Sequence, residues 1–239
     1  MRILITNDDG IGAPVLPHLV RWAQGLGDVT VVAPKVEQSG KSHAIDFTRP
    51  IEIKEVDIAD DIRVWSMDST PADCVRFAVL GMGRKFDLIL SGINRGFNLG
   101  KDIVYSGTCG AIFEGARLGI KGIALSTDPR DFSYAISRLD YVWSLVEQYK
   151  LLELNPLYNI NIPLDDEGYH FTRQGGIYFT DEFIHTGGDI YEQSGHLLES
   201  NSRDFTLDTD TVRNNRISIT PLTPERTALD TFNKLIANN

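Results

Sequence analysis

The chain has 239 residues, which is enough to bury a hydrophobic core without disulfide bonds and excludes the small stapled scaffolds. Its 23 basic and 33 acidic residues give a net charge of -10, which argues against a nucleic-acid polymer as a partner. The segment 151–200 holds nine acidic residues and one basic residue, so the excess acid is concentrated there.

Residues 1–33 predict a β-α-β unit. The apolar runs 2–7 and 29–33 are typical of buried parallel strands. A helical apolar period lies between them, and Pro14 suits the first helical position. This arrangement is the usual beginning of an α/β domain.

The middle of the chain continues with alternating elements. Residues 51–56 and 62–65 alternate between apolar and polar side chains, which predicts half-exposed strands in an antiparallel addition. The pattern then predicts helices at 71–82, 108–118 and 132–149, separated by strands at 86–90 and 122–126. This order predicts an α/β fold with three layers (αβα), in which helices cover both faces of a Rossmann-like mixed sheet.

The signal changes after about residue 155. Strands are predicted at 158–162 and 217–219, and the glycine-rich, acidic stretch between them contains only weak strand candidates such as 176–179. Hairpin turns are suggested by three glycines of this stretch: Gly187, Gly188 and Gly195.

A last helix is predicted at 224–236. We expect it to dock through four apolar side chains: Leu229, Phe232, Leu235 and Ile236. The whole chain, 1–239, is therefore expected to form a single domain. Its core, 1–155, carries the candidate site, and 156–239 supplies an extended C-terminal β-hairpin region and a terminal helix.

The loop after the first strand places Asp8 and Asp9 side by side. Two carboxylates at a turn can converge on a hard divalent cation, which prefers oxygen ligands. The alternative is ordinary turn and helix-cap chemistry, for which Asn, Asp and Gly are the usual residues. A dinucleotide site is disfavoured, because Val15 stands where the Gly-x-Gly-x-x-Gly pattern needs its third glycine.

The loop after the second strand offers Ser39 and His43. A Ser-Gly pair such as Ser39-Gly40 is usually only a turn. His43 is a candidate proton carrier, although an exposed loop histidine is the commoner case.

A third loop leaves a strand at Ser91 and carries Asn94 and Asn98 before a helix opens at Ser106 and Thr108. Four glycines in this stretch let backbone N–H groups approach an anion, and the two hydroxyls complete a phosphate cradle at the helix N-terminus. The alternative is that Ser106 or Thr108 only caps the helix.

Carboxylates, neutral oxygen ligands and a phosphate cradle together predict metal-assisted phosphoryl hydrolysis, with Asp8 and Asp9 the nearest candidates for the general base. A covalent aspartyl-phosphate mechanism fits less well, because it would place Asp at alternate positions after the strand. Two other functions stay open. A nucleotide-binding module without turnover would not need the carboxylate pair, and a metal-dependent sugar-nucleotide transferase does not suit the short cradle.

The two cysteines, Cys74 and Cys109, lie in apolar, helix-like segments, as buried thiols do in a reducing compartment. No apolar run approaches the roughly 20 residues that span a bilayer, and the chain opens in a strand pattern rather than a signal peptide. We therefore expect a cytoplasmic protein without a membrane partner.

Several motifs, in this order along the chain, resemble the SurE family of stationary-phase survival proteins, which are metal-dependent nucleotidases. They are LITNDDGIGAP at 4–14, PADCV at 71–75, SGIN at 91–94, YSGT at 105–108 and SITPL at 218–222. The resemblance implies that one Mg²⁺ or Mn²⁺ per subunit is bound by Asp8, Asp9, Ser39 and Asn94. It also implies that the phosphate is held by Asn98, Ser106, Gly107 and Thr108.

The activity implied by the resemblance is hydrolysis of nucleoside 5′- and 3′-monophosphates to nucleoside and phosphate, with short polyphosphate a further substrate in some members. The implied fold is a Rossmann-like core whose C-terminal hairpin and tail exchange between subunits of a homodimer or homotetramer. Residues 181–200 match the family's hairpin only loosely, so base selectivity and oligomer geometry are the family properties that can least be transferred to this chain.

Overall fold

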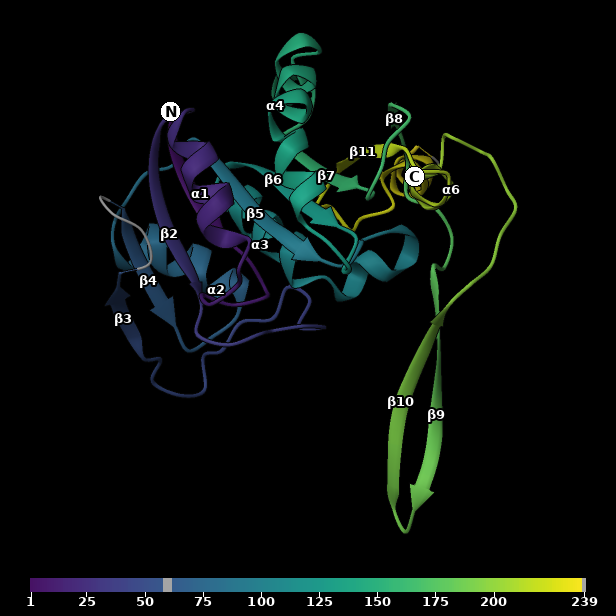
Figure 1. Cartoon of the computed structure of the whole chain (residues 1–239), viewed down its shortest axis with the longest axis horizontal. Helices are drawn as coiled ribbons and strands as arrows, with labels where there is room; N and C mark the ends of the chain where they lie inside the picture. Colours follow the sequence, from purple (N-terminus) through teal and green to yellow (C-terminus); the bar gives the residue numbers. More distant parts are fainter. Residues whose placement is uncertain (58–61, 238–239) are drawn as a thin grey trace.

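The protein is described from a computed structural model of the chain, which describes residues 1–57 and 62–237. Nine strands form one sheet: β1 (Arg2–Thr6), β2 (Asp28–Pro34), β3 (Ile53–Val56), β4 (Arg63–Met67), β5 (Leu88–Arg95), β6 (Lys121–Thr127), β7 (Leu157–Ile162), β8 (Tyr169–Phe171) and β11 (Ile217–Leu222). Their order across the sheet is β3-β4-β2-β1-β5-β6-β7-β11-β8 (Figure 1).

Helices cover both faces of this sheet because the buried strands are apolar on both sides. In β1, Ile3 and Ile5 pack into the cluster that contains residues of α1 (Leu16–Gln24) and α4 (Ser133–Gln148). Leu4 faces the opposite cluster, with residues of α2 (Pro71–Arg76) and α3 (Gly107–Arg117). The predicted three-layer αβα architecture is confirmed.

Three further helical segments lie close to these helices. The predicted helix 71–82 continues beyond α2 as a π-helical turn, η1 (Phe77–Gly81). A 3-10 segment, η2 (Gly100–Tyr105), precedes α3, and the short α5 (Leu151–Leu154) follows α4. No helix in the described part of the chain is long and apolar enough to cross a membrane.

The central strands from β4 to β7 all run parallel, and antiparallel pairing occurs only toward the edges of the described sheet. β3 is antiparallel to β4, and β11 is antiparallel to β7. The prediction that residues 51–56 and 62–65 form an antiparallel addition is therefore correct for their own pairing, β3 with β4, and wrong for the attachment to the rest of the sheet, where β4 pairs with β2 in parallel register.

The first helix begins later than predicted. Backbone turns from Ala13 to Gly10 and from Leu16 to Ala13 occupy the segment around Pro14. The proline in the first turn of α1 is Pro17, where the missing N–H costs no helical hydrogen bond. Pro14 is thus a loop residue and not the first residue of the helix.

The acidic stretch forms a separate two-stranded hairpin of β9 (Phe179–Gly187) and β10 (Ile190–Leu197), which projects from the body in Figure 1. Its turn contains Gly188, as predicted, while Gly187 is the last residue of β9 before the turn and pairs with Ile190. The strand predicted at 176–179 is wrong except for Phe179, where β9 begins. Gly195 is not a turn residue either, because it pairs with Asp181 inside the hairpin.

The chain after the hairpin forms α6 (Asp208–Arg213), β11 and the last helix, α7 (Leu229–Ile236). α7 is shorter than the predicted 224–236. Its four apolar side chains do not dock on the body: their exposed fractions are 54% for Leu229, 49% for Phe232, 63% for Leu235 and 52% for Ile236. The amphipathic period predicted a helix correctly, but its apolar face is exposed to solvent in the single chain.

Candidate active site

Three loops meet at the carboxyl edge of the sheet, where β2, β1 and β5 are neighbours. The backbone N–H of Gln38, after β2, donates to the carbonyl oxygen of Asp8, after β1, at 2.7 Å. The backbone N–H of Arg95, at the end of β5, donates to Oδ2 of Asp9 at 3.1 Å. The predicted metal-ligand segments from these strands are therefore joined directly.

Asp8 lies beneath the start of α3. Its side chain is buried, and Oδ1 accepts a hydrogen bond of 2.8 Å from the Thr108 hydroxyl. Burial raises the pKa of Asp8 to about 6, the Thr108 hydrogen bond opposes that rise, and the charge of Asp9 adds to it. A Cβ at Gly107 would lie 3.1 Å from Cβ and 3.2 Å from Oδ2 of Asp8, so a larger residue would press on the Asp8 side chain.

Asp9 is partly buried beside Asp8. Burial raises its pKa, the hydrogen bond from the Arg95 backbone lowers it, and the charge of Glu37 raises it again. Two adjacent carboxylates with raised pKa values are unfavourable as neighbouring anions, and a cation between their oxygens would relieve this cost.

Ser39 and Asn94 supply neutral oxygens from the flanking loops. Ser39 is exposed, and its hydroxyl donates to Oε1 of Glu37 at 2.5 Å. The Nδ2 atom of Asn94 donates to the carbonyl oxygen of Gly96 at 2.8 Å, which leaves the amide oxygen as the acceptor of that side chain. Asn94 still belongs to β5, so the prediction that the chain leaves the strand at Ser91 is wrong: pairing with β6 shifts between these residues and then resumes.

The donor set fits a hard divalent cation. Within residues 1–57 and 62–237 there is no group of three or more His, Cys, Asp or Glu residues suited to a metal. Two carboxylates with a hydroxyl and an amide oxygen suit Mg²⁺ or Mn²⁺, and Mg²⁺ usually keeps several water ligands.

Asn98, a predicted phosphate ligand, is held in a buried polar frame. Its Nδ2 atom donates to Oγ of Ser126 at 2.8 Å, and its backbone N–H donates to Oδ1 of Asn161 at 2.9 Å. The amide groups of Asn159 and Asn161 both donate to its carbonyl oxygen. Sequence reasoning missed this frame, although two asparagines at alternate positions of the apolar strand β7 were a visible signal.

Ser106 and Thr108 have different local roles. The Ser106 hydroxyl accepts from the backbone N–H of Cys109 at 3.0 Å and so caps α3. Thr108 is fully buried and faces Asp8. The helix-cap alternative is therefore realised at Ser106, while Gly107 and Thr108 bring the positive end of α3 to the carboxylate pair.

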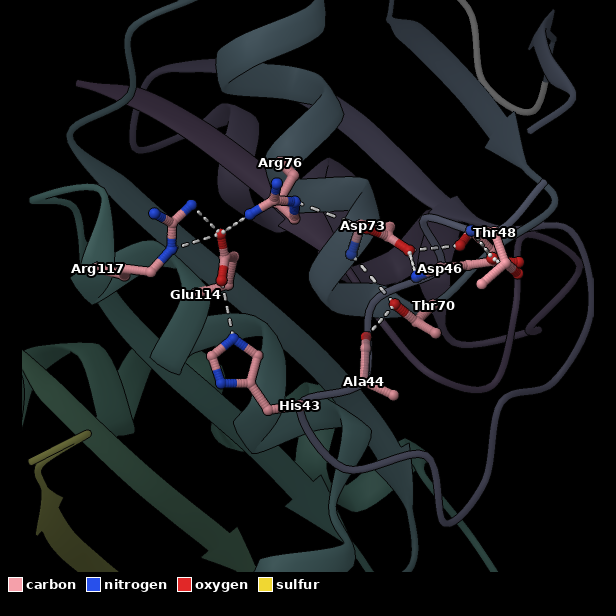
Figure 2. A network of polar contacts seen from close by, with 10 residues as sticks. His43, Ala44, Asp46, Thr48, Thr70, Asp73, Arg76, Glu114 and Arg117 are labelled. Carbon is pink, nitrogen blue, oxygen red and sulfur yellow. Dashed lines mark hydrogen bonds and ion pairs between the residues drawn. The ribbon is translucent and has the colours of Figure 1, made fainter. Parts of the chain in front are cut away.

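The loop after Ser39 is tied to α3 through Glu114, which is drawn with its partners in Figure 2. Oε2 of Glu114 lies 2.9 Å from Nε2 of His43, and its Oε1 accepts from Arg76 at 3.1 Å and from Arg117 at 2.6 Å. Burial alone would raise the pKa of Glu114, but the hydrogen bonds of His43 and Arg117, with Arg76, lower it to about 2. The expectation that His43 is simply an exposed loop histidine is wrong.

The same loop is held to α2 by two further contacts (Figure 2). The Thr70 hydroxyl donates to the carbonyl oxygen of Ala44 at 2.6 Å, and the backbone N–H of Asp46 donates to Oδ2 of Asp73 at 2.7 Å. Together with Glu114, these contacts fix the course of the loop that presents Ser39 to the candidate metal site.

Comparison with known proteins gives one consistent result. The family model described as Survival protein SurE matches residues 3–181. The chain is 35% identical to the 5'-nucleotidase SurE of Thermosipho melanesiensis over 93% of this chain and 91% of that protein. It is 37% identical to the 5'-nucleotidase SurE of Herpetosiphon aurantiacus over 98% of this chain and 97% of that protein. The crystal structure of the SurE protein from Aquifex aeolicus superposes with a TM-score of 0.78 and 31% identity, covering 98% of each chain.

Proposed function

The chain belongs to the Survival protein SurE family, and from that premise we propose that it is a 5'-nucleotidase, a phosphoric monoester hydrolase that depends on a divalent cation. The observation that carries the proposal is the contact between Thr108 and Asp8. It joins a carboxylate pair suited to a cation with a helix N-terminus suited to an anion. A phosphate ester needs both features in one place.

Each predicted site residue has a role in this proposal. Asp8, Asp9, Ser39 and Asn94 would hold one Mg²⁺ or Mn²⁺ per subunit. The cation would neutralise phosphate oxygens and activate water for attack on phosphorus. The backbone N–H groups of Gly107 and Thr108 would orient the phosphate beside it, with Asn98 and Ser106 completing the cradle.

Asp8 and Asp9 are also the proposed proton acceptors. Asp9 is the less buried of the two, and one of its oxygens accepts from the Arg95 N–H, so the other is the one that would face both the cation and the attacking water. Its carboxylate is thus the better placed general base.

The direct test is phosphate release from AMP by the purified chain with Mg²⁺ or Mn²⁺. We expect release that EDTA stops and added metal restores. Tight AMP binding in EDTA without hydrolysis after metal is restored would contradict the proposal and support a binding module instead. The same assay with 3'-AMP and with tripolyphosphate tests the proposed wider substrate range, and transfer of a sugar in place of phosphate release would indicate a transferase.

We also propose that the chain folds as one domain, 1–239, that acts as a homodimer or homotetramer. The first part is supported by β7, β8 and β11, which extend the sheet of the core 1–155 with strands from 156–239. The second is supported by the apolar side chains that β9, β10 and α7 leave exposed, including Phe183 and Leu235. A cytoplasmic location is supported by Cys74 and Cys109, which are both buried free thiols.

A further inference from the structure

The segment between Asn98 and Ser106 determines how far apart the proposed phosphate ligands lie. Asn98 stands at one end of it, and Ser106 at the other end leads into Gly107 and Thr108. Between them the chain passes through η2, which begins at Gly100. Contacts that hold Gly100 therefore contribute to the span of the phosphate loop, the name used below for residues 98–108.

Asp208, the first residue of α6, fixes Gly100 from a position 108 residues away. Its side chain is fully buried. Oδ2 accepts from the backbone N–H of Gly100 at 3.0 Å, whereas Oδ1 accepts from the N–H groups of Gly175 at 2.8 Å and Thr209 at 2.7 Å. One carboxylate thus joins the phosphate loop to two segments of the C-terminal region, through three charge-assisted hydrogen bonds.

The backbones at this junction approach too closely for side chains. Gly100 has a φ of +53°, and a Cβ there would collide with the carbonyl oxygen of Gly176. A Cβ at Gly175 would likewise collide with the Thr209 hydroxyl. The junction is therefore tightly packed, and Asp208 contacts all three segments at once.

Neighbouring contacts extend the junction to the root of the hairpin. Nε2 of Gln174 donates to the carbonyl oxygen of Gly100 at 2.6 Å. Oδ2 of Asp102, in η2, accepts from the backbone N–H groups of Tyr178 at 3.0 Å and Phe179 at 2.9 Å. Since Phe179 is the first residue of β9, the phosphate loop is attached to the base of the projecting hairpin.

We propose that Asp208 is a positioning residue for phosphate binding: it holds Gly100, and through it the phosphate loop, in the conformation that lets Asn98 and the Ser106–Thr108 turn act on one phosphate. The inference rests on the proposed function and extends it, because it makes the C-terminal region part of the binding machinery. Burial raises the pKa of Asp208 while the N–H groups of Gly100, Gly175 and Thr209 lower it, as expected for a carboxylate kept for these contacts.

The variant Asp208→Asn distinguishes the contact of Oδ2 with the phosphate loop from the contacts of Oδ1 with the C-terminal region. An amide has one accepting oxygen, and the oxygen is favoured on the side where Gly175 and Thr209 both donate. The NH₂ group then faces the N–H of Gly100, so the contact to the phosphate loop is lost while the contacts within the C-terminal region persist. Asp210→Asn is the matched control, since Asp210 is a buried residue of the same helix whose contacts are with Asp204 and Arg213.

We expect Asp208→Asn to raise KM for AMP by about tenfold with a much smaller change in kcat, because a buried N–H left without its acceptor destabilises the loop. Competitive inhibition by inorganic phosphate should weaken by a similar factor, while the Mn²⁺ dependence stays as in the wild type. Gln174→Ala, at an exposed position, removes the second contact to Gly100 and should change KM in the same direction.

The inference is overturned if Asp208→Asn and Asp210→Asn change KM, kcat and the thermal midpoint alike, or if Asp208→Asn leaves KM unchanged, whatever the effect of Gln174→Ala. Failure of the proposed function has a different signature, which is a wild-type chain that releases no phosphate. In that case calorimetric binding of inorganic phosphate with Mn²⁺ decides the role of Asp208. Weaker binding by Asp208→Asn alone would support the inference, and equal binding would refute it.

Discussion

Thr108 and Asp8, 100 residues apart in the chain, are joined by a hydrogen bond of 2.8 Å from the threonine hydroxyl to Oδ1. The contact fixes one carboxylate oxygen and leaves Oδ2 of Asp8 beside Gly107 at the N-terminus of α3. The Thr108 side chain therefore orients the carboxylate from the helix whose N-terminus would face the substrate in the proposed function.

Replacing Thr108 by valine tests this relationship, because valine keeps the shape and removes only the hydroxyl. The buried oxygen of Asp8 would lose its donor, at a cost of about 1–3 kcal/mol in the free energy of unfolding. Phosphate release with Mn²⁺ should fall by at least about tenfold, since the carboxylate is free to turn. Thr108→Ser keeps the hydroxyl and should retain most of the rate; equal losses in the two variants would contradict the assignment.

Asp9→Asn removes one negative charge from the proposed metal site and keeps the shape of the side chain. Its oxygen can still accept the hydrogen bond from the Arg95 backbone, so the fold should be little affected. The metal-dependent rate should fall at least about 100-fold, because a ligand and the proposed general base are lost together. The control is Asp28→Asn, at an exposed position at the start of β2. An unchanged rate in Asp9→Asn with saturating Mn²⁺ would disprove the role of this carboxylate.

The parts of the site that were predictable are those that follow directly from buried strands. Asp8 and Asp9 lie in the loop directly after β1, and Asn94 stands near the end of β5. In a parallel sheet these ends lie at one edge, so local periodicity is enough to bring them together. The same reasoning gave the three layers of the fold correctly.

The parts that were missed depend on partners distant in the sequence. Asp208 reads locally as a residue of a short polar helix, and only the folded chain places it against Gly100. Glu114 reads as part of an amphipathic helix, yet it is buried against His43 and the two cationic side chains of Arg76 and Arg117. The exposed apolar face of α7 is a third case, because an amphipathic period predicts an apolar face without specifying what covers it.

The ion pairs of Glu114 predict how the free energy of unfolding depends on pH. Its pKa in the folded protein is about 2, below the value of roughly 4.3 for an unperturbed glutamate. A depressed pKa stabilises the folded state fully above the unfolded value, and this contribution is lost as pH falls from about 4.5 toward 2. A shift of this size corresponds to on the order of 3 kcal/mol.

The variant Glu114→Gln should therefore lower the free energy of unfolding at neutral pH and flatten its decline between about pH 4.5 and 2. Urea unfolding at several pH values measures both effects. Glu147→Gln, at an exposed position near the end of α4, should reproduce the wild-type profile. An acid limb as steep in Glu114→Gln as in the wild type would show that other carboxylates determine the acid stability.

The hairpin of β9 and β10 has an apolar face that predicts where subunits would associate. Strand register places Phe183 opposite Gln193 and Tyr191 opposite His185, so Phe183 and Tyr191 lie diagonally on one face of the ribbon. Phe179 and Leu197, which pair with each other, belong to the same face. Phe183 is 71% exposed and Tyr191 is 59% exposed. Such an apolar face on a two-stranded ribbon is poorly stable in water alone and is expected to be buried by a second subunit.

A charge on this face should therefore break the oligomer. We expect the wild-type chain to have the mass of a dimer or tetramer by light scattering, and Phe183→Asp to shift it toward the monomer. Thr180→Asp, at a position that pairs with His196 in the regular part of the hairpin, adds the same charge to the opposite face of the ribbon and should leave the mass unchanged. A monomeric wild type, or an oligomer that survives Phe183→Asp, would mean that the apolar face of the hairpin does not mediate assembly. If AMP hydrolysis weakens as the oligomer dissociates, the contacts of Asp102 with Tyr178 and Phe179 provide the physical link, because they attach the phosphate loop to the root of the hairpin.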